Sequence, residues 1–289
     1  MIKNLLRKHY NLTKVRWYVF KVSFLPKIGF QVRSKKHSLD SALIVSLTSY
    51  PKRFEQLHLT LMSLLNQTIR PDKIVLWIAK DDMSQLPLKV INLEKKGISI
   101  LQTEDILSYK KIIPTLKEYP NNFIITVDDD LYYHPTLIEE LIDTSKRYPN
   151  EVIASRTHLM KFDSNNQLLP YSKWGWLEFD NAEGNHNFFT SGAGTLFPPN
   201  CFYKDISQKE LFMKLAPHAD DVWLNWMVRL NKKQVYCTNE MKPIVSWQET
   251  QDEALWHSNV GESGNDLQIT RMVEHYQFPK NGIATPFHT

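Results

Sequence analysis

The feature that most constrains the fold of this chain is a short apolar run that leads directly into three aspartates. Residues 123–127 read Phe-Ile-Ile-Thr-Val, and Asp128, Asp129 and Asp130 follow without a break. An apolar run without polar alternation predicts a strand that is buried on both faces, as in a parallel sheet. Open α/β sheets bind their ligands outside the carboxyl ends of their strands, so the aspartates lie where a ligand is expected.

Three adjacent carboxylates repel one another, and burying them without compensation is costly. A divalent cation would offset this repulsion. Because successive strand residues point to opposite sides, we expect Asp128 and Asp130 to face one way and Asp129 the other. Asp128 and Asp130 would then supply two hard oxygen ligands for Mn²⁺ or Mg²⁺. The alternative is a solvated acidic turn after the strand.

The first half of the chain alternates predicted strands with helical patterns. Strands are expected at residues 42–47, 73–79, 98–101 and 123–127, and helical patterns at 54–65, 83–95 and 109–119. This alternation is typical of βαβ units. The predicted fold class is therefore α/β, with a mostly parallel central sheet flanked by helices. Neither the GxGxxG fingerprint nor the GxxxxGK[ST] phosphate loop is present.

The second half begins with a predicted helix at residues 135–148 and a predicted strand at 151–157, and residues 160–190 appear irregular. The segment Ser191, Gly192, Ala193 and Gly194 then combines two glycines with small residues. Such a segment permits close approach of the backbone to a ligand. A tight bend or a bulge explains the same glycines equally well.

A second acidic pair, Asp220 and Asp221, precedes an amphipathic helical pattern. One aspartate at a helix N-terminus is ordinarily a cap. Two aspartates beside His218 are less well explained as caps, and one of them is a candidate general base. Further along, His257 lies in a loop rich in Gly, Ser and Asn. It is a candidate metal or phosphate ligand, although a lone histidine is more often structural.

Composition places the chain among folded globular proteins. It has 289 residues, 42% of them hydrophobic and 12% aromatic, enough for one large domain or two small ones. The two cysteines form no CxxC, so neither a zinc cage nor a disulfide scaffold is indicated, and a reducing compartment is expected. Neither a membrane-spanning apolar run nor a cleavable signal pattern is evident.

The net charge of +4 hides a strong asymmetry. Residues 1–39 hold ten Lys and Arg and no Asp or Glu, so residues 40–289 carry a net charge of −6. Aromatic residues are interleaved with the basic ones, as in segments that rest on an anionic membrane surface. A basic arm packed on the domain is the second interpretation, and nucleic-acid binding is the last, because the body is acidic.

Taken together, these stretches resemble glycosyltransferases of the GT-A fold, in particular bacterial family-2-like enzymes that build lipopolysaccharide, O-antigen or capsule. The resemblance covers about residues 42–270. Residues 44–53 are similar to the first nucleotide-binding strand and loop, and residues 64–77 to the next helix and strand. Residues 128–130 are similar to the DxD motif, residues 191–194 to a substrate-lining segment, and residues 220–224 to the acidic motif that supplies the base in inverting members.

The resemblance implies a metal-dependent transfer of a sugar from a nucleotide sugar, with a UDP-sugar as the commonest donor. The acceptor would be a glycan or a lipid-linked oligosaccharide. Asp221, or else Asp220, would be the base of an inverting reaction, and Asp128 and Asp130, with His257, would hold Mn²⁺ or Mg²⁺. Thr48, Tyr50, Arg53, Lys111 and Asp129 would contact the nucleotide or donor, and residues 191–194 with Trp223 would line the substrate site; Trp174 and Trp176 are further candidates for stacking on sugars.

The basic leader, which the resemblance does not cover, and the resemblance together predict a domain division and a location. Residues 1–40 would be a basic arm, and residues 41–289 one catalytic domain with a nucleotide-binding half (41–133) and an acceptor half (134–289). A cytoplasmic protein on the inner face of the membrane is expected, with no nucleic-acid partner. Two other functions stay open: a Mg²⁺-dependent nucleotidyl- or phosphotransferase, and a catalytically inactive glycan-binding protein of the same fold.

Overall fold

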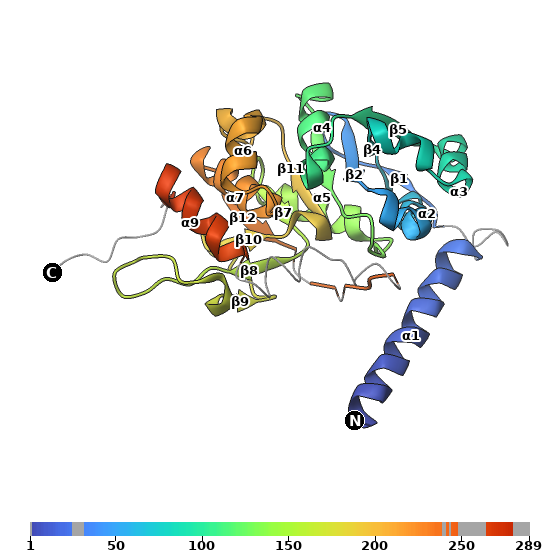
Figure 1. Ribbon diagram of the computed structural model, residues 1–289, viewed down its shortest axis with the longest axis horizontal. Coiled ribbons are helices and arrows are strands. Elements are labelled where there is room, and N and C mark those ends of the chain that lie inside the picture. Colours follow the sequence, from blue (N-terminus) through green and yellow to red (C-terminus); the bar gives the residue numbers. More distant parts are fainter. Residues whose placement is uncertain (1, 25–31, 239–240, 243, 248–263, 280–289) are drawn as a thin grey trace.

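A seven-stranded sheet forms the centre of the protein, in a computed structural model that describes residues 2–24, 32–238, 241–242, 244–247 and 264–279 (Figure 1). The strand order is β12-β7-β11-β6-β2-β4-β5. Its strands are β2 (Leu43–Thr48), β4 (Lys73–Ala79), β5 (Ile98–Thr103), β6 (Phe123–Thr126), β7 (Val152–Ala154), β11 (Thr195–Phe197) and β12 (Val235–Cys237). All neighbouring pairs are parallel except those made by β11, which runs antiparallel to β6 and β7. The predicted fold class, a mostly parallel α/β sheet flanked by helices, is confirmed.

The expected helical segments of the first half are present, but two of them are divided. Residues 51–65 form η2 (Pro51–Arg53) and α2 (Phe54–Leu65). The other two patterns are divided into shorter elements. They form η3 (Lys80–Gln85), α3 (Leu88–Ile91) and η4 (Asn92–Lys96), and then η5 (Leu107–Lys111) and α4 (Ile113–Glu118). Pro87 separates η3 from α3, because proline lacks the N–H that would continue a helix, whereas Pro114 lies in the first turn of α4, where that N–H is not needed.

Helices cover both faces of the sheet because strand side chains alternate between them. On one face, α2 and α5 (Leu137–Arg147) pack against Leu43, Val45 and Leu47 of β2, all of which are buried. On the other face, η5, α6 (Lys209–Leu215), α7 (Asp220–Leu230) and α9 (Gly264–Tyr276) pack against Val152, Ala154 and Phe197. The central strands are therefore enclosed, which explains their uninterrupted apolar character.

Residues 155–190 contain more structure than the sequence indicates. The strand expected at 151–157 is two strands, because the chain leaves the main sheet after β7 and enters a small antiparallel sheet. That sheet has the order β10-β8-β9, formed by β8 (Thr157–Leu159), β9 (Gly175–Trp176) and β10 (Asn187–Phe189). Short elements complete the described fold: η6 (Tyr171–Lys173), η7 (Ser191–Ala193), η8 (Lys204–Ser207), and the parallel pair β1 (Lys35–Lys36) with β3 (Ile69–Arg70).

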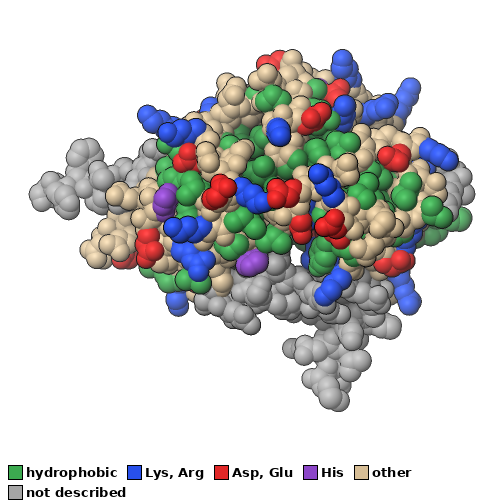
Figure 2. All heavy atoms as spheres, turned by 45° about the horizontal axis from the view of Figure 1, so that its top comes forward, with side chains coloured by type: hydrophobic (Ala, Val, Ile, Leu, Met, Phe, Trp, Pro, Cys, Tyr) green, Lys and Arg blue, Asp and Glu red, His purple; other side chains and the backbone are tan. Residues whose placement is uncertain are grey.

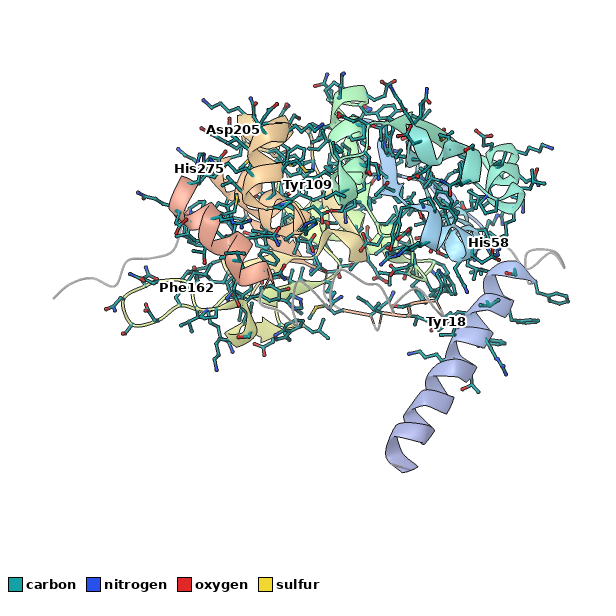
Figure 3. The ribbon with its side chains drawn as sticks, in the orientation of Figure 1. Tyr18, His58, Tyr109, Phe162, Asp205 and His275 are labelled. Atoms are coloured by element: carbon teal, nitrogen blue, oxygen red, sulfur yellow. The ribbon has the colours of Figure 1, made fainter. Side chains whose placement is uncertain are left out.

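The basic N-terminal arm forms helix α1 (Ile2–Ser23), which projects from the body (Figure 1). Its last turns are docked: Val22 is buried against Leu59 and Trp247, and the Tyr18 ring lies 4.1 Å from that of Tyr132 (Figure 3). The packing interpretation thus holds for this end of the helix. No helix among the described residues is long and apolar enough to cross a membrane.

The face of the body shown in Figure 2 carries mixed charge. Lys and Arg side chains are interspersed with Asp and Glu over the face shown in Figure 2, so this face presents no continuous basic track. The proposed division into two halves at residues 133 and 134 stays a prediction.

Candidate functional site

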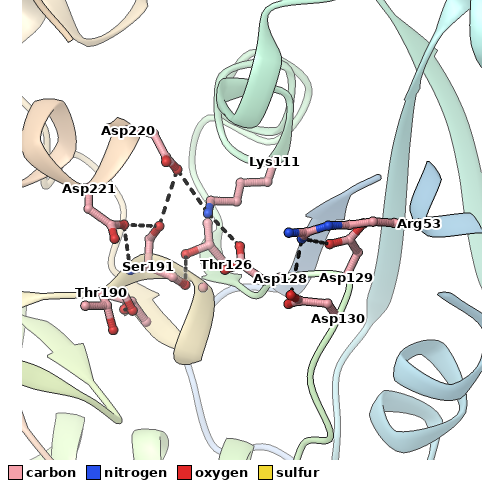
Figure 4. Close-up of polar contacts among 12 residues, drawn as sticks. Arg53, Lys111, Thr126, Asp128, Asp129, Asp130, Thr190, Ser191, Asp220 and Asp221 are labelled. Atoms are coloured by element: carbon pink, nitrogen blue, oxygen red, sulfur yellow. Dashed lines mark hydrogen bonds and ion pairs between the residues drawn. The ribbon is translucent and has the colours of Figure 1, made fainter. Parts of the chain in front are cut away.

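The acidic triplet lies in a turn rather than in a strand. Strand β6 ends at Thr126, so the alternation expected for residues 128–130 does not apply, and that prediction is wrong. Asp129 and Asp130 point together at one cation: Arg53 Nη1 lies 2.8 Å from Asp129 Oδ1 and 3.3 Å from Asp130 Oδ2 (Figure 4). Asp128 points the other way, toward Lys111 Nζ at 2.8 Å. The triplet is therefore divided between two basic residues.

Neighbouring segments fix this turn through its backbone. The Asp128 amide donates to Tyr133 Oη at 2.7 Å and to the Gly192 carbonyl at 3.0 Å. Thr60 Oγ1 donates to the carbonyl oxygens of Asp129 and Leu131, and the Trp247 indole in turn donates to Thr60 Oγ1. The carboxylates are thus held in place by residues from α2, the 191–194 bend and the 244–247 segment.

Lys111 joins the two acidic motifs. Its Nζ, 2.8 Å from Asp128 Oδ1, is also 3.0 Å from Asp220 Oδ2 at the start of α7 (Figure 4). Burial opposes a charge on Lys111, but the carboxylates of Asp128, Asp220 and Asp221 raise its pKa above the ordinary value. The same lysine lowers the pKa of Asp128 against the effect of burial. One buried ammonium group therefore holds together aspartates that are far apart in the sequence.

Asp221 has the environment of a base. Its Oδ1 accepts hydrogen bonds from the Ser191 amide at 2.8 Å and from Ser191 Oγ at 2.5 Å, and no described residue donates to its Oδ2. Burial, and then the charge of Asp220, raise the pKa of Asp221 to about 6. Neither aspartate caps α7, because Ala219 is the N-cap residue and no side-chain cap bond forms. The capping interpretation of the pair is therefore wrong.

Both acidic motifs face one cavity of about 610 Å³. This volume is within the range of small-molecule and cofactor sites. The described residues that line it include six aspartates and four Lys and Arg, so carboxyl groups outnumber basic groups by two. The crowding is visible in Asp130, whose pKa burial and the charge of Asp129 raise to about 7. Burial and the neighbouring carboxylates thus act against full ionisation of this part of the cavity.

A divalent cation fits this set of groups. Carboxylates are the ligands that Mg²⁺ and Mn²⁺ prefer, and Mg²⁺ commonly takes only one or two of them together with substrate phosphates. No group of three His, Cys, Asp or Glu among the described residues is arranged to hold a metal. A cation at residues 128–130 therefore stays a prediction, and it would need further ligands from a bound substrate.

Most of the predicted site residues line this cavity. They comprise Thr48, Tyr50, Arg53, Lys111, Asp128, Asp129, Asp130, Gly192, Ala193, Asp220, Asp221 and Trp176. Ser191 lies behind the wall and binds Asp221 instead. Gly194, with φ at +110°, turns the chain away beside Leu137. His257 lies outside the described residues.

Gly192 shows which close approach the small residues permit. A Cβ on Gly192 would lie 1.7 Å from Asp128 Oδ2, so the glycine makes room for the Asp128 side chain. The group that approaches Gly192 in the structure is thus a carboxylate of the protein, and the predicted close approach to a ligand stays a prediction. Gly194 serves the bend itself, as the second interpretation of this segment expected.

Trp223 does not line the site, so that prediction is wrong. It is fully buried, and its indole donates to the Ile206 carbonyl at 3.1 Å. Although it lies two residues from Asp221, it belongs to the side of α7 that faces the core, because helical residues two apart point in different directions. Trp174 is also a core residue, with an exposed fraction of 3%.

Sequence reasoning missed several polar residues of the cavity: Arg156, His158 and Tyr171. A signal for Arg156 was available, because it follows the carboxyl end of β7, where ligands of such sheets gather. His158 is kept neutral, since burial and the charge of Arg156 lower its pKa to about 3. Nothing in the local sequence distinguishes Tyr171 from a core tyrosine.

Comparison with known proteins adds little to this geometry. No family model and no curated protein matches the chain. One similar solved structure is that of 4-diphosphocytidyl-2C-methyl-D-erythritol synthase from Anaerococcus prevotii, with 17% identity and a TM-score of 0.43, over 77% of this chain and 96% of that one. A similarity at this level carries no argument about activity. The class that the fold and the site define is an α/β protein with a deep acidic cavity at the carboxyl ends of its parallel strands.

Proposed function

We propose that the protein is a glycosyltransferase that moves a sugar from a nucleotide sugar, with a UDP-sugar as the first donor to test, to an acceptor hydroxyl. The observation that carries this proposal is the Lys111 bridge between Asp128 and Asp220 on one acidic cavity. It brings a cation-binding group beside a candidate base, which is the pairing that glycosyl transfer from a diphosphate needs. The order of motifs along the chain favours inversion.

In this reaction, the acceptor oxygen attacks the anomeric carbon while the bond from that carbon to the diphosphate breaks. The acceptor proton passes to Asp221, and the electron pair leaves with the nucleoside diphosphate. Asp221 suits the task because its pKa of about 6 makes it a stronger base than an ordinary carboxylate, yet one that is deprotonated at neutral pH. Ser191 holds Asp221 in one orientation through two hydrogen bonds.

Mn²⁺ or Mg²⁺ bound at residues 128–130 would neutralise the charge that develops on the leaving diphosphate. Because Asp128 and Asp130 point to different cations in the structure, a metal held by both would require one of these carboxylates to leave its present partner. On the protein side, the buried Lys111 and the partly buried Arg53 are the cations beside these carboxylates, and both line the cavity in which a phosphate would bind. Tyr50, whose ring lies 5.5 Å from the Arg53 guanidinium, and Thr48 complete the wall on which the nucleotide would lie.

The experiment asks whether the protein binds a sugar nucleotide and releases a nucleoside diphosphate from it. Purified protein with Mn²⁺ is screened by thermal shift against a panel of sugar nucleotides, and the best ligand is then assayed for release of nucleoside diphosphate. We expect stabilisation by at least one sugar nucleotide and a slow release that a suitable acceptor accelerates. Binding of no sugar nucleotide, with Mn²⁺ present, would refute the proposal.

The nucleotidyltransferase alternative is tested in the same preparation. Nucleotidyl transfer would release pyrophosphate from a nucleoside triphosphate and a sugar phosphate, whereas glycosyl transfer releases a nucleoside diphosphate. The identity of the released phosphate product therefore decides between them.

We also propose that α1 holds the protein on an anionic membrane surface, near a lipid-linked acceptor. Trp17, Phe20 and Phe24 form an exposed stacked row, with ring centroids 5.7 and 5.0 Å apart. Lys14, Arg16 and Lys21 accompany them on the same two turns. Exposed aromatic rings beside basic residues suit the boundary between headgroups and acyl chains.

A further inference from the structure

Arg156 occupies the wall of the cavity with its backbone firmly held. It lies between β7 of the main sheet and β8 of the small sheet, and its carbonyl accepts the Thr190 amide at 3.2 Å. The preceding Ser155 bonds to the Gly194 carbonyl through its amide and to the Ala193 carbonyl through its hydroxyl. The base of the Arg156 side chain therefore has a fixed position at the edge of the cavity.

The guanidinium of Arg156 has no partner in the described part of the chain. It makes no ion pair or side-chain hydrogen bond there, and its Nε is enclosed without an acceptor. Thr190, which also lines the cavity, has an enclosed hydroxyl that is likewise unpartnered. Enclosed polar atoms are ordinarily hydrogen-bonded, and an enclosed donor without an acceptor is costly. Two such groups on one wall indicate that a ligand completes them.

The charge of Arg156 acts on nearby carboxylates although it forms no ion pair with them. Burial raises the pKa of Asp128, and Lys111, then Arg53 and last Arg156 lower it. Neither Asp128 nor Asp221 lies within ion-pair distance of Arg156. Burial, the first cause, lowers the pKa of Arg156, while the charges of Tyr171 and Asp221 act against this. The guanidinium thus lies near the reacting groups and keeps its hydrogen-bond donors for another acceptor.

The position of Arg156 indicates which substrate supplies that acceptor. A second cavity of about 130 Å³ adjoins the first, and the two share Leu131, Arg156, Ala193 and Ile244. Tyr18 of α1 lines this smaller cavity, whereas Thr48, Tyr50 and Arg53, the nucleotide candidates, line only the larger one. Arg156 therefore stands on the side away from the nucleotide, on the path toward α1.

We infer that Arg156 and Thr190 form an oxyanion-binding subsite for the acceptor. The acceptor then carries a carboxylate or a phosphate close to the hydroxyl that receives the sugar. A guanidinium binds either group through two parallel hydrogen bonds, and the Thr190 hydroxyl can donate a third. The assignment to the acceptor rests on the proposed glycosyl transfer; the oxyanion subsite itself rests only on the cavity.

The test measures binding rather than turnover. Methyl glucuronide, glycerol phosphate and neutral methyl glucoside are titrated into the full chain, with binding followed by ligand-observed NMR. We expect the glucuronide or the phosphate to bind more tightly than the glucoside, and the tighter one identifies the source of the oxyanion. Arg156→Gln should weaken binding of that acidic probe by roughly 10- to 100-fold, which corresponds to the loss of a charged hydrogen-bonded pair. Binding of the neutral glucoside should stay unchanged.

Two further variants make this result specific. Arg156→Lys keeps the charge but loses the two parallel N–H donors of the guanidinium, so binding of intermediate strength is expected. This variant provides the test if Arg156→Gln fails to fold. Arg70→Gln, an exposed position on β3 outside both cavities, should bind like the wild type. Equal binding of acid and neutral probes by the wild type, or an unchanged preference in Arg156→Gln, would overturn the subsite.

Competition distinguishes this inference from the proposed function. UDP with Mn²⁺ should leave binding of the acidic probe unaffected; displacement would assign Arg156 to the leaving diphosphate and overturn the acceptor subsite. A wild type that prefers the acidic probe but binds no sugar nucleotide would instead refute glycosyl transfer and leave the oxyanion subsite standing.

Discussion

At the scale of single residues, charge decides what the cavity can do. Lys111 is in contact with Asp128 and Asp220 at once, so it balances one carboxylate from each acidic motif. Asp221 is left beside that pair with Ser191 as its hydrogen-bond donor. The two neighbouring aspartates of α7 consequently have different roles in the proposed reaction: Asp220 positions Lys111, and Asp221 receives the proton.

Replacing the proposed base tests this division directly. Asp221→Asn should lower transfer by about 10³-fold or more, because general-base groups contribute about 10²- to 10⁴-fold. Donor binding, measured by thermal shift with the sugar nucleotide, should stay within a few-fold of wild type. Asp143→Asn on the exposed surface of α5 is the matched control and should keep full activity. An active Asp221→Asn enzyme would transfer the role to Asp220.

The pH dependence of the reaction follows from the pKa of Asp221. Because that pKa is raised to about 6, Asp221 is protonated below pH 6 and no longer accepts a proton, so kcat/KM should fall about tenfold per unit there. The stability of the fold should instead decrease with rising pH. The Asp221 carboxyl binds its proton more tightly in the folded protein than in the unfolded chain, where its pKa is about 4. Its contribution to the unfolding free energy therefore falls as the pH rises from about 4 to 6. A plot of kcat/KM against pH whose acidic limb is centred near pH 4 would contradict the raised pKa of Asp221.

At the scale of elements, the bend at η7 connects the two acidic motifs. It follows β10, contacts Asp128 and Tyr133 through Gly192, holds Asp221 through Ser191, and turns into the antiparallel strand β11. The two glycines of the bend serve different purposes. Gly192 leaves room for a carboxylate, whereas Gly194 adopts a left-handed conformation that other residues rarely adopt.

Substituting each glycine by alanine should therefore have a different effect. Gly192→Ala should displace the Asp128 carboxylate from Lys111 and abolish most transfer, with little change in the unfolding free energy. Gly194→Ala should lower that free energy by roughly 1–3 kcal/mol, because its φ is +110° and the new Cβ would lie 2.9 Å from Leu137. Urea denaturation and donor turnover, measured on both variants, check the two effects. Equal loss of stability in both would contradict the distinction.

Helix α1 offers a separate test of the membrane proposal. Replacing Trp17, Phe20 and Phe24 by serine should weaken binding to anionic liposomes by roughly tenfold or more for each ring removed from the interface. Binding by the wild type should also weaken at high salt, because part of it is electrostatic. Leu88→Ser, at an apolar position on α3 that is 75% exposed, is the control. Unchanged liposome sedimentation of the triple variant would count against α1 as the contact.

At the scale of the whole molecule, the fold gathers more carboxyl groups than basic groups around one cavity. Among the described lining residues, the excess of two aspartates, when both are ionised, equals the charge of one divalent cation. A ligand that binds only the folded state stabilises it by mass action. The folded protein should therefore gain stability from the cation even without nucleotide.

Thermal denaturation with and without Mn²⁺ measures this gain. At Mn²⁺ concentrations about 100 times the dissociation constant, the unfolding free energy should rise by about 2.7 kcal/mol, and EDTA should reverse the rise. Asp128→Asn should remove the effect, whereas Asp143→Asn should retain it. A melting temperature that Mn²⁺ leaves unchanged would argue against a cation held by the apoprotein at residues 128–130.

The local sequence was sufficient to predict the strands of the first half and the place of the acidic residues. Strand β4 has the predicted bounds, and β2, β5 and β6 lie where their apolar runs indicated. Buried parallel strands carry their signal in consecutive residues, so no distant contact is needed to detect them. Asp128 and Asp221 could also be located from the local sequence, because Asp128 follows the apolar run of β6 and Asp221 lies in the first turn of the amphipathic helix α7.

Only the tertiary structure decided how these residues meet. Lys111 reaches Asp220, and Arg53 reaches Asp129 and Asp130, because strands distant in sequence are neighbours in the sheet and β11 is inserted antiparallel between β6 and β7. The burial of Trp223 and the unpartnered guanidinium of Arg156 depend on the same packing. Local periodicity specifies elements, but the contacts between elements depend on strand order and on which groups share one buried volume, and neighbouring residues do not encode these.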